Sequence, residues 1–99
     1  MTGIDYSGPE RRRGGPDRRA LDDVTRILVV DDHALFRMGI ANILGHEPDF
    51  EIVAEAEDSR GAIDRALETS PDIILMDLSL PAPGGIETTQ RIKRELPST

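Results

Sequence analysis

The sequence predicts an α/β fold built on a doubly wound parallel sheet. Short apolar runs rich in β-branched residues alternate with segments whose apolar residues recur at helical spacing, in the order strand then helix, three times over. Acidic residues stand directly after two of the apolar runs. Strands joined by helices pair in parallel through right-handed crossovers, and sites form at the carboxyl ends of such strands.

Composition divides the chain near residue 25. Residues 1–25 are rich in Gly, Pro, Arg and Asp and show no periodic apolar pattern, which predicts a disordered tail. The tail holds five Arg and five acidic residues, so residues 26–99 carry the whole net charge of −7. An acidic folded body is a poor match for nucleic acid. The Arg residues of the tail could dock on an acidic partner or an anionic lipid surface, or simply be solvated.

The remaining composition narrows the class of protein. A chain of 99 residues has room for one domain. It has no cysteine, which excludes disulfides and thiolate metal sites. No apolar run approaches the roughly 18 residues that a membrane span requires. We therefore expect a cytoplasmic protein with no membrane span.

The first predicted strand, residues 27–30 (ILVV), is apolar throughout and suits a strand buried on both faces. A helix should follow it and end at Gly45, placed as a C-terminal cap. The expected buried face of this helix consists of Phe36, Ile40, Ile43 and Leu44.

The second predicted strand, residues 50–56 (FEIVAEA), mostly alternates apolar and polar residues. Asp58 or Ser59 can cap the helix after it, and the pair at residues 70–71 (Ser-Pro) should stop that helix. Its expected buried stripe is Ala62, Ile63, Ala66 and Leu67.

The third predicted strand, residues 73–76 (IILM), is again fully apolar and ends at Asp77. A loop at residues 81–85 (PAPGG) should lead into the third helix. The expected inner side of this helix is Ile86, Thr89, Ile92 and Leu96.

Three acidic residues form the strongest candidate site. Asp31 and Asp32 follow the first strand and Asp77 follows the third, so the carboxylates meet if these strands are neighbours. Three such groups repel, and one would normally take up a proton. A divalent cation with oxygen ligands removes that penalty, and Mg²⁺ is the usual choice where a carboxylate attacks phosphorus. The alternative is that each Asp only caps a helix or starts a turn.

Two segments of the chain carry a family resemblance. Residues 27–33 (ILVVDDH) and residues 71–81 (PDIILMDLSLP), continued by residues 84–87 (GGIE), resemble the receiver domain of bacterial two-component response regulators. Residues 32–40 (DHALFRMGI) further resemble the NarL/FixJ-like subfamily, whose receivers are fused to a LuxR-type helix-turn-helix output domain. The resemblance covers residues 26 to about 96. It implies a flavodoxin-like fold and a signalling role, with no enzyme activity beyond Mg²⁺-dependent self-phosphorylation and dephosphorylation.

The resemblance also implies a role for each acidic residue. Asp77 would accept a phosphoryl group from a sensor histidine kinase and contribute to the Mg²⁺ site. Asp32 would bind Mg²⁺ directly and Asp31 mainly through water, while the backbone carbonyl of Ser79 would supply another oxygen. His33 invites a phosphotransfer or metal-binding role, but a residue here more often opens the first helix and flanks the site.

Three further residues would shape the loop after the phosphorylated strand. They are Pro81, Gly84 and Gly85. Gly tolerates the positive φ that a sharp turn into a helix can require.

The resemblance further implies that the fold is incomplete. A complete receiver has five strands, and the last two carry a Ser or Thr and a Lys that contact the phosphoryl group. This sequence supplies three strands, so residues 26–99 are expected to be the N-terminal portion of a receiver, without the last two βα units. The third strand would then be an open apolar edge. DNA binding and control of transcription would require an output domain outside this chain.

Two other functions are open at this point. A truncated receiver could act as a phosphorylation-independent interaction module that forms a homodimer or pairs its open strand edge with a partner. An Asp-nucleophile phosphatase of the haloacid-dehalogenase kind would need Asp-x-Asp after the first strand, whereas residues 31–34 read Asp-Asp-His-Ala.

Overall fold

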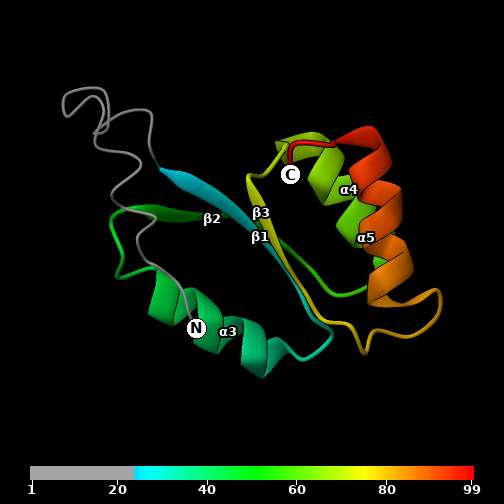
Figure 1. Cartoon of the computed structure of the whole chain (residues 1–99). Helices are drawn as coiled ribbons and strands as arrows, with labels where there is room; N and C mark the ends of the chain where they lie inside the picture. The colour runs from blue at the N-terminus through cyan, green and yellow to red at the C-terminus, as the bar shows by residue number, and fades with distance from the viewer. Residues whose placement is uncertain (1–23) are drawn as a thin grey trace.

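A computed structural model describes residues 24–99 and shows three strands alternating with three helices (Figure 1). The elements are β1 (Thr25–Val30), α3 (Ala34–Leu44), β2 (Phe50–Ala56), α4 (Ser59–Thr69), β3 (Ile73–Met76) and α5 (Gly84–Glu95). The predicted α/β class and element order are confirmed. The predicted tail lies outside the described residues, apart from its last two positions, and β1 already begins at Thr25.

The strands form one parallel sheet in the order β2-β1-β3. Val30, the last residue of β1, lies opposite Ala56 of β2 and opposite Met76 of β3. The carboxyl ends of all three strands are therefore level with one another, which is the arrangement that gathers side chains from distant parts of the chain.

Two layers of helices cover the sheet: α3 lies on one face, and α4 and α5 lie together on the other (Figure 1). The main core forms between the sheet and the α4–α5 pair. Its buried members are Leu28, Val30, Ala56, Ala62, Ala66, Leu80 and Ile92. Burial of a large aliphatic side chain contributes about 1.5–3 kcal/mol, so this side of the sheet holds the molecule together.

The first helix is less buried than predicted. Within α3, Ile40 and Leu44 are half-buried, but Phe36 and Ile43 are 55% and 62% exposed. The helix packs on β2, and its other flank lies beside an open cavity of about 470 Å³ that Phe36 and Leu75 line. The predicted face is therefore wrong for Phe36 and Ile43, because no further helix of the described chain covers this side. Gly45 caps the helix end as predicted.

The second helix follows its predicted limits. The Asp58 side chain accepts a hydrogen bond from the N–H of Gly61 at 2.7 Å, and Ser70 ends the helix in the left-handed conformation with φ 47°. Ala62 and Ala66 are buried and Ile63 is half-buried, but Leu67 is 49% exposed. The predicted stripe of α4 is thus correct except at Leu67.

The third helix is rotated from its predicted orientation. Its buried residues are Gly85, Thr88 and Ile92, while Ile86 is 62% exposed and Thr89 is exposed as well. The hydroxyl of Thr88 lies 2.6 Å from that of Ser59 and donates to the carbonyl of Gly84. These contacts turn α5 toward α4, so the predicted burial of Ile86 and Thr89 is wrong, whereas Ile92 is buried and Leu96 half-buried as expected.

Strand β3 forms an edge of the sheet, as predicted. Ile73 and Leu75 on this strand are 42% and 40% exposed. Across the part of the chain that the structure describes, no helix is long and apolar enough to cross a membrane.

Candidate metal centre

Backbone hydrogen bonds extend the sheet by one residue beyond two of its strands and thereby place two acids. The N–H of Asp31 donates to the carbonyl of Ala56 at 3.0 Å, and the N–H of Asp77 donates to the carbonyl of Val30 at 3.0 Å. Asp31 and Asp77 are consequently held by the main chain at the carboxyl edge of the sheet.

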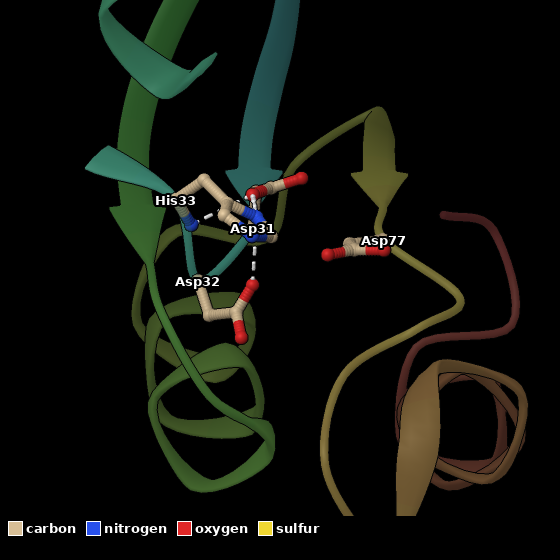
Figure 2. A group of neighbouring side chains, drawn as sticks. All are labelled: Asp31, Asp32, His33 and Asp77. Carbon is tan, nitrogen blue, oxygen red and sulfur yellow. Dashed lines mark hydrogen bonds and ion pairs between the residues drawn. The ribbon is translucent and has the colours of Figure 1, made fainter. Parts of the chain in front are cut away.

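The structure brings the three predicted carboxylates together with His33 (Figure 2). Ligand atoms of Asp31, Asp32, His33 and Asp77 all lie within 4.8 Å of one another. Asp31 is buried, whereas Asp32 and His33 are exposed and Asp77 is half-buried. The carboxylate of Asp77 reaches from β3 toward the three residues that follow β1 (Figure 2).

His33 neutralises part of this negative charge. Its Nδ1 lies 2.9 Å from one oxygen of Asp31 and 2.9 Å from one oxygen of Asp32. Its backbone N–H also donates to Asp31 at 2.8 Å. The hydrogen bond to Asp31 and the charges of Asp32 and Asp31 raise the pKa of His33 above its ordinary value of 6.5. His33 also occupies the N-cap position of α3, so it both flanks the cluster and opens the helix.

Ser79 keeps Asp77 ionised. Its hydroxyl and its backbone N–H both donate to Oδ1 of Asp77, at 2.7 and 2.9 Å. These two hydrogen bonds, with smaller effects of Asp31 and of the His33 charge, lower the pKa of Asp77 below its ordinary value of 3.8. Sequence reasoning missed this role of Ser79 and considered only its backbone carbonyl, whose binding to a metal stays a prediction.

The residues after Ser79 anchor α5 beside the site. The carbonyl of Pro81 accepts a hydrogen bond from Gly84 at 2.9 Å, and Gly84 has the positive φ, 91°, that only Gly adopts readily. Both Gly84 and Gly85 lie in the first turn of α5, so the loop ends two residues earlier than predicted, whereas the positive φ expected of a Gly at this turn is found at Gly84. A Cβ at Gly85 would come within 2.5 Å of the carbonyl oxygen of Asp77. Gly85 is therefore required for close contact between helix and site, not for an unusual φ.

Arg37 is a second contributor that sequence reasoning missed. Its guanidinium donates through Nη1 to the backbone carbonyl of Asp31 and through Nε to Glu55 at 3.1 Å. A signal was present in the sequence, because Arg37 shares one helix side with the half-buried Ile40 and Leu44. A charged residue on an inward helix side usually has a specific partner.

The donor set suits a hard cation. The cluster offers three carboxylates, and Mg²⁺ binds carboxylate oxygens while keeping several waters, which a partly exposed site permits. Exposed acidic residues also occur together without a metal. The supporting feature is therefore the placement of Asp31 and Asp77, whose backbone N–H groups are hydrogen-bonded at the ends of neighbouring strands. The side chains of Asp31, Asp32 and Asp77 therefore fit a divalent cation.

The fold and this cluster define a class: α/β domains with an acidic, cation-compatible site at the carboxyl edge of a parallel sheet. Comparison with known proteins specifies the family. Residues 27–99 match the response regulator receiver domain, and the chain belongs to this family. It is 48% identical over 71 residues to the transcriptional regulatory protein LiaR of Bacillus subtilis, covering 72% of this chain and 34% of LiaR. The chain thus spans about a third of the length of that relative.

Solved structures give the same family. A LuxR-family two-component response regulator from Aurantimonas sp. SI85-9A1 matches with a TM-score of 0.69 and 44% identity, over 73% of this chain and 51% of that one. The complex of the P1 domain of CheA3 with CheY6 from R. sphaeroides contains a match with a TM-score of 0.67 and 30% identity, over 76% of this chain and 59% of that one. The receiver assignment and the flavodoxin-like fold expected from the resemblance are confirmed.

The pairing of His33 with the acids predicts a measurable titration. In metal-free protein, ¹H NMR should give His33 a pKa above 6.5, and Asp31→Asn should lower it by removing the main stabilising partner. Because the folded pKa is raised, this pairing stabilises the fold below the unfolded pKa and is lost as the pH rises through the folded pKa. Asp64→Asn, which removes an exposed carboxylate on α4, serves as the control and should leave the His33 titration unchanged. An unaltered pKa in Asp31→Asn would contradict the assignment.

Proposed function

We propose that this chain is the phosphoacceptor module of a two-component response regulator, with Asp77 accepting a phosphoryl group from a sensor histidine kinase. The observation that carries the proposal is the ionised carboxylate of Asp77, grouped with Asp31 and Asp32 at the carboxyl edge of the sheet. Membership of the receiver domain family supports it.

Asp77 acts in this proposal as a nucleophile. One of its oxygens forms a bond to phosphorus while the bond from phosphorus to the imidazole nitrogen of the kinase breaks, leaving the electron pair on that nitrogen. Ser79 donates both of its hydrogen bonds to Oδ1, so we assign the attack to Oδ2. The low pKa of Asp77 means that no proton has to leave the carboxyl group before attack at neutral pH.

Mg²⁺ is the cation we propose for the site. Asp31, Asp32 and Asp77 would hold it, with the backbone carbonyl of Ser79 as a further ligand. When bound, it supplies positive charge that offsets the repulsion between the carboxylates and the incoming phosphoryl oxygens.

The partner and the output belong to the same proposal. The complex of the P1 domain of CheA3 with CheY6, which contains a match to this chain, supports docking of a partner domain on this chain, and the partner we propose is a sensor histidine kinase. LiaR is a transcriptional regulatory protein, which supports control of transcription through an output domain outside this chain. A regulator of transcription must reach DNA, so we place the protein in the cytoplasm.

Acetyl phosphate and Mg²⁺ provide the test. The intact chain should gain the mass of one phosphoryl group, located at Asp77 by peptide mapping, and chelation of Mg²⁺ with EDTA should prevent the gain. Asp77→Asn should abolish it because the nucleophile is lost, whereas Asp64→Asn, with an equal change of charge on exposed α4, should retain it. Equal labelling of the Asp77→Asn protein would refute the proposal.

A second candidate function is favoured by the exposed edge of β3. Ile73 and Leu75 offer an apolar strand edge that can pair with another chain. If the chain works as a phosphorylation-independent interaction module, sedimentation equilibrium should show self-association that Asp77→Asn does not alter. Leu75→Lys should weaken it, because a charged side chain on an edge strand opposes pairing. A monomer at all concentrations would exclude homodimerisation through this edge.

A further inference from the structure

We propose that Arg37 is a positioning residue for the cation site and acts through the backbone of Asp31. This inference rests on the proposed function, because it concerns the same site. Arg37 is not one of the acidic ligands. It lies on α3, whereas the proposed ligands follow β1 and β3.

The contacts of Arg37 join three segments of the chain. Its side chain, only 16% exposed, extends from α3 and donates to the carbonyl of Asp31 after β1 and to the carboxylate of Glu55 in β2. One guanidinium therefore fixes the start of α3 against the ends of two neighbouring strands. The planar fork of Arg suits two acceptors in different directions, which a single ammonium group does not.

Asp31 is the acid whose placement depends most on its surroundings. Among the described residues it is the one buried carboxylate, at 8% exposure. Its N–H is held by Ala56, and its carbonyl is held by Arg37. With both backbone groups bonded, the peptide planes on either side of Asp31 are fixed, and so is the direction in which its carboxylate leaves the chain. Glu55 keeps the guanidinium in place for this contact.

Positioning and simple charge effects predict opposite results. If Arg37 acted only as a positive charge near a cation site, its removal would relieve repulsion and tighten Mg²⁺ binding. If Arg37 orients Asp31, its removal should weaken Mg²⁺ binding, since losing the partners that orient metal ligands commonly lowers metal affinity by about tenfold or more. The sign of the change therefore distinguishes the two roles.

Calorimetric titration of Mg²⁺ into the full chain tests this inference. Arg37→Met keeps most of the aliphatic length and should weaken binding by about tenfold. Arg37→Lys should fall between Arg37→Met and wild type, because its ammonium group cannot serve both acceptors equally. Arg94→Met removes the same charge from the exposed last turn of α5, so it should leave the affinity unchanged or slightly tighter. Unchanged or tighter binding in a folded Arg37→Met protein would overturn the proposal.

Phosphorylation by acetyl phosphate at varied Mg²⁺ gives a second readout. Arg37→Met should raise the Mg²⁺ concentration for half-maximal rate but leave the rate at saturating Mg²⁺ close to wild type, because Ser79 holds Asp77 independently of Arg37. A loss of rate that saturating Mg²⁺ does not restore would contradict a positioning role.

Glu55 supplies a variant pair should Arg37→Met fail to fold. Glu55→Gln keeps an acceptor for Nε of Arg37 and should bind Mg²⁺ nearly as wild type does, whereas Glu55→Ala should bind it more weakly. If Glu55→Gln, Glu55→Ala and Arg37→Lys all bind Mg²⁺ with the affinity of wild type, the inference is overturned. Wild-type protein that neither binds Mg²⁺ nor is modified at Asp77 would instead refute the proposed function, and the role of Arg37 with it.

Discussion

The parallel pairing of β1 with β3 holds the parts of the candidate site at fixed separations. A hydrogen bond from Asp77 to Val30 continues this pairing past β3, and one from Asp31 to Ala56 continues the pairing of β1 with β2. Asp31 and Asp77 are therefore placed by the main chain and are brought together even though their carboxylates repel. Helix α5 depends on the same geometry, because Gly85 packs against the carbonyl of Asp77.

The charge of the cluster is balanced by groups from its immediate surroundings. Three carboxylates in one place should raise the pKa of at least one of them, yet the pKa of Asp77 is lowered. The hydrogen bonds from Ser79 outweigh the effect of desolvation on the pKa of Asp77, and His33 takes up a proton more readily because it pairs with Asp31 and Asp32. The site therefore keeps an ionised Asp77, which suits the nucleophilic role proposed for it.

Much of the fold could be predicted because strands and caps are local features, and the acids could be grouped because strand ends meet at one edge. The rotation of α5 could not be predicted. Ile86 and Thr88 lie on nearly opposite sides of this helix, and Thr88, which contacts Ser59 of α4, is the buried one. Phe36 fits a buried stripe in sequence, but its burial requires a neighbour that local periodicity does not specify. The hydrogen bonds of Ser79 depend on loop geometry, which the sequence pattern does not specify. The position of Arg37 on the inner side of α3 indicates a partner, but not which groups it contacts.

Paramagnetic NMR with Mn²⁺ tests the central claim, that three carboxylates from two strand ends form one cation site, most directly. Mn²⁺ prefers the same oxygen ligands as Mg²⁺ and broadens the signals of nearby nuclei. Saturable broadening should begin at the amides of Asp31, Asp32 and Asp77 and should be displaced by excess Mg²⁺. Broadening centred on the exposed acids of α4, or no saturable broadening, would contradict the account.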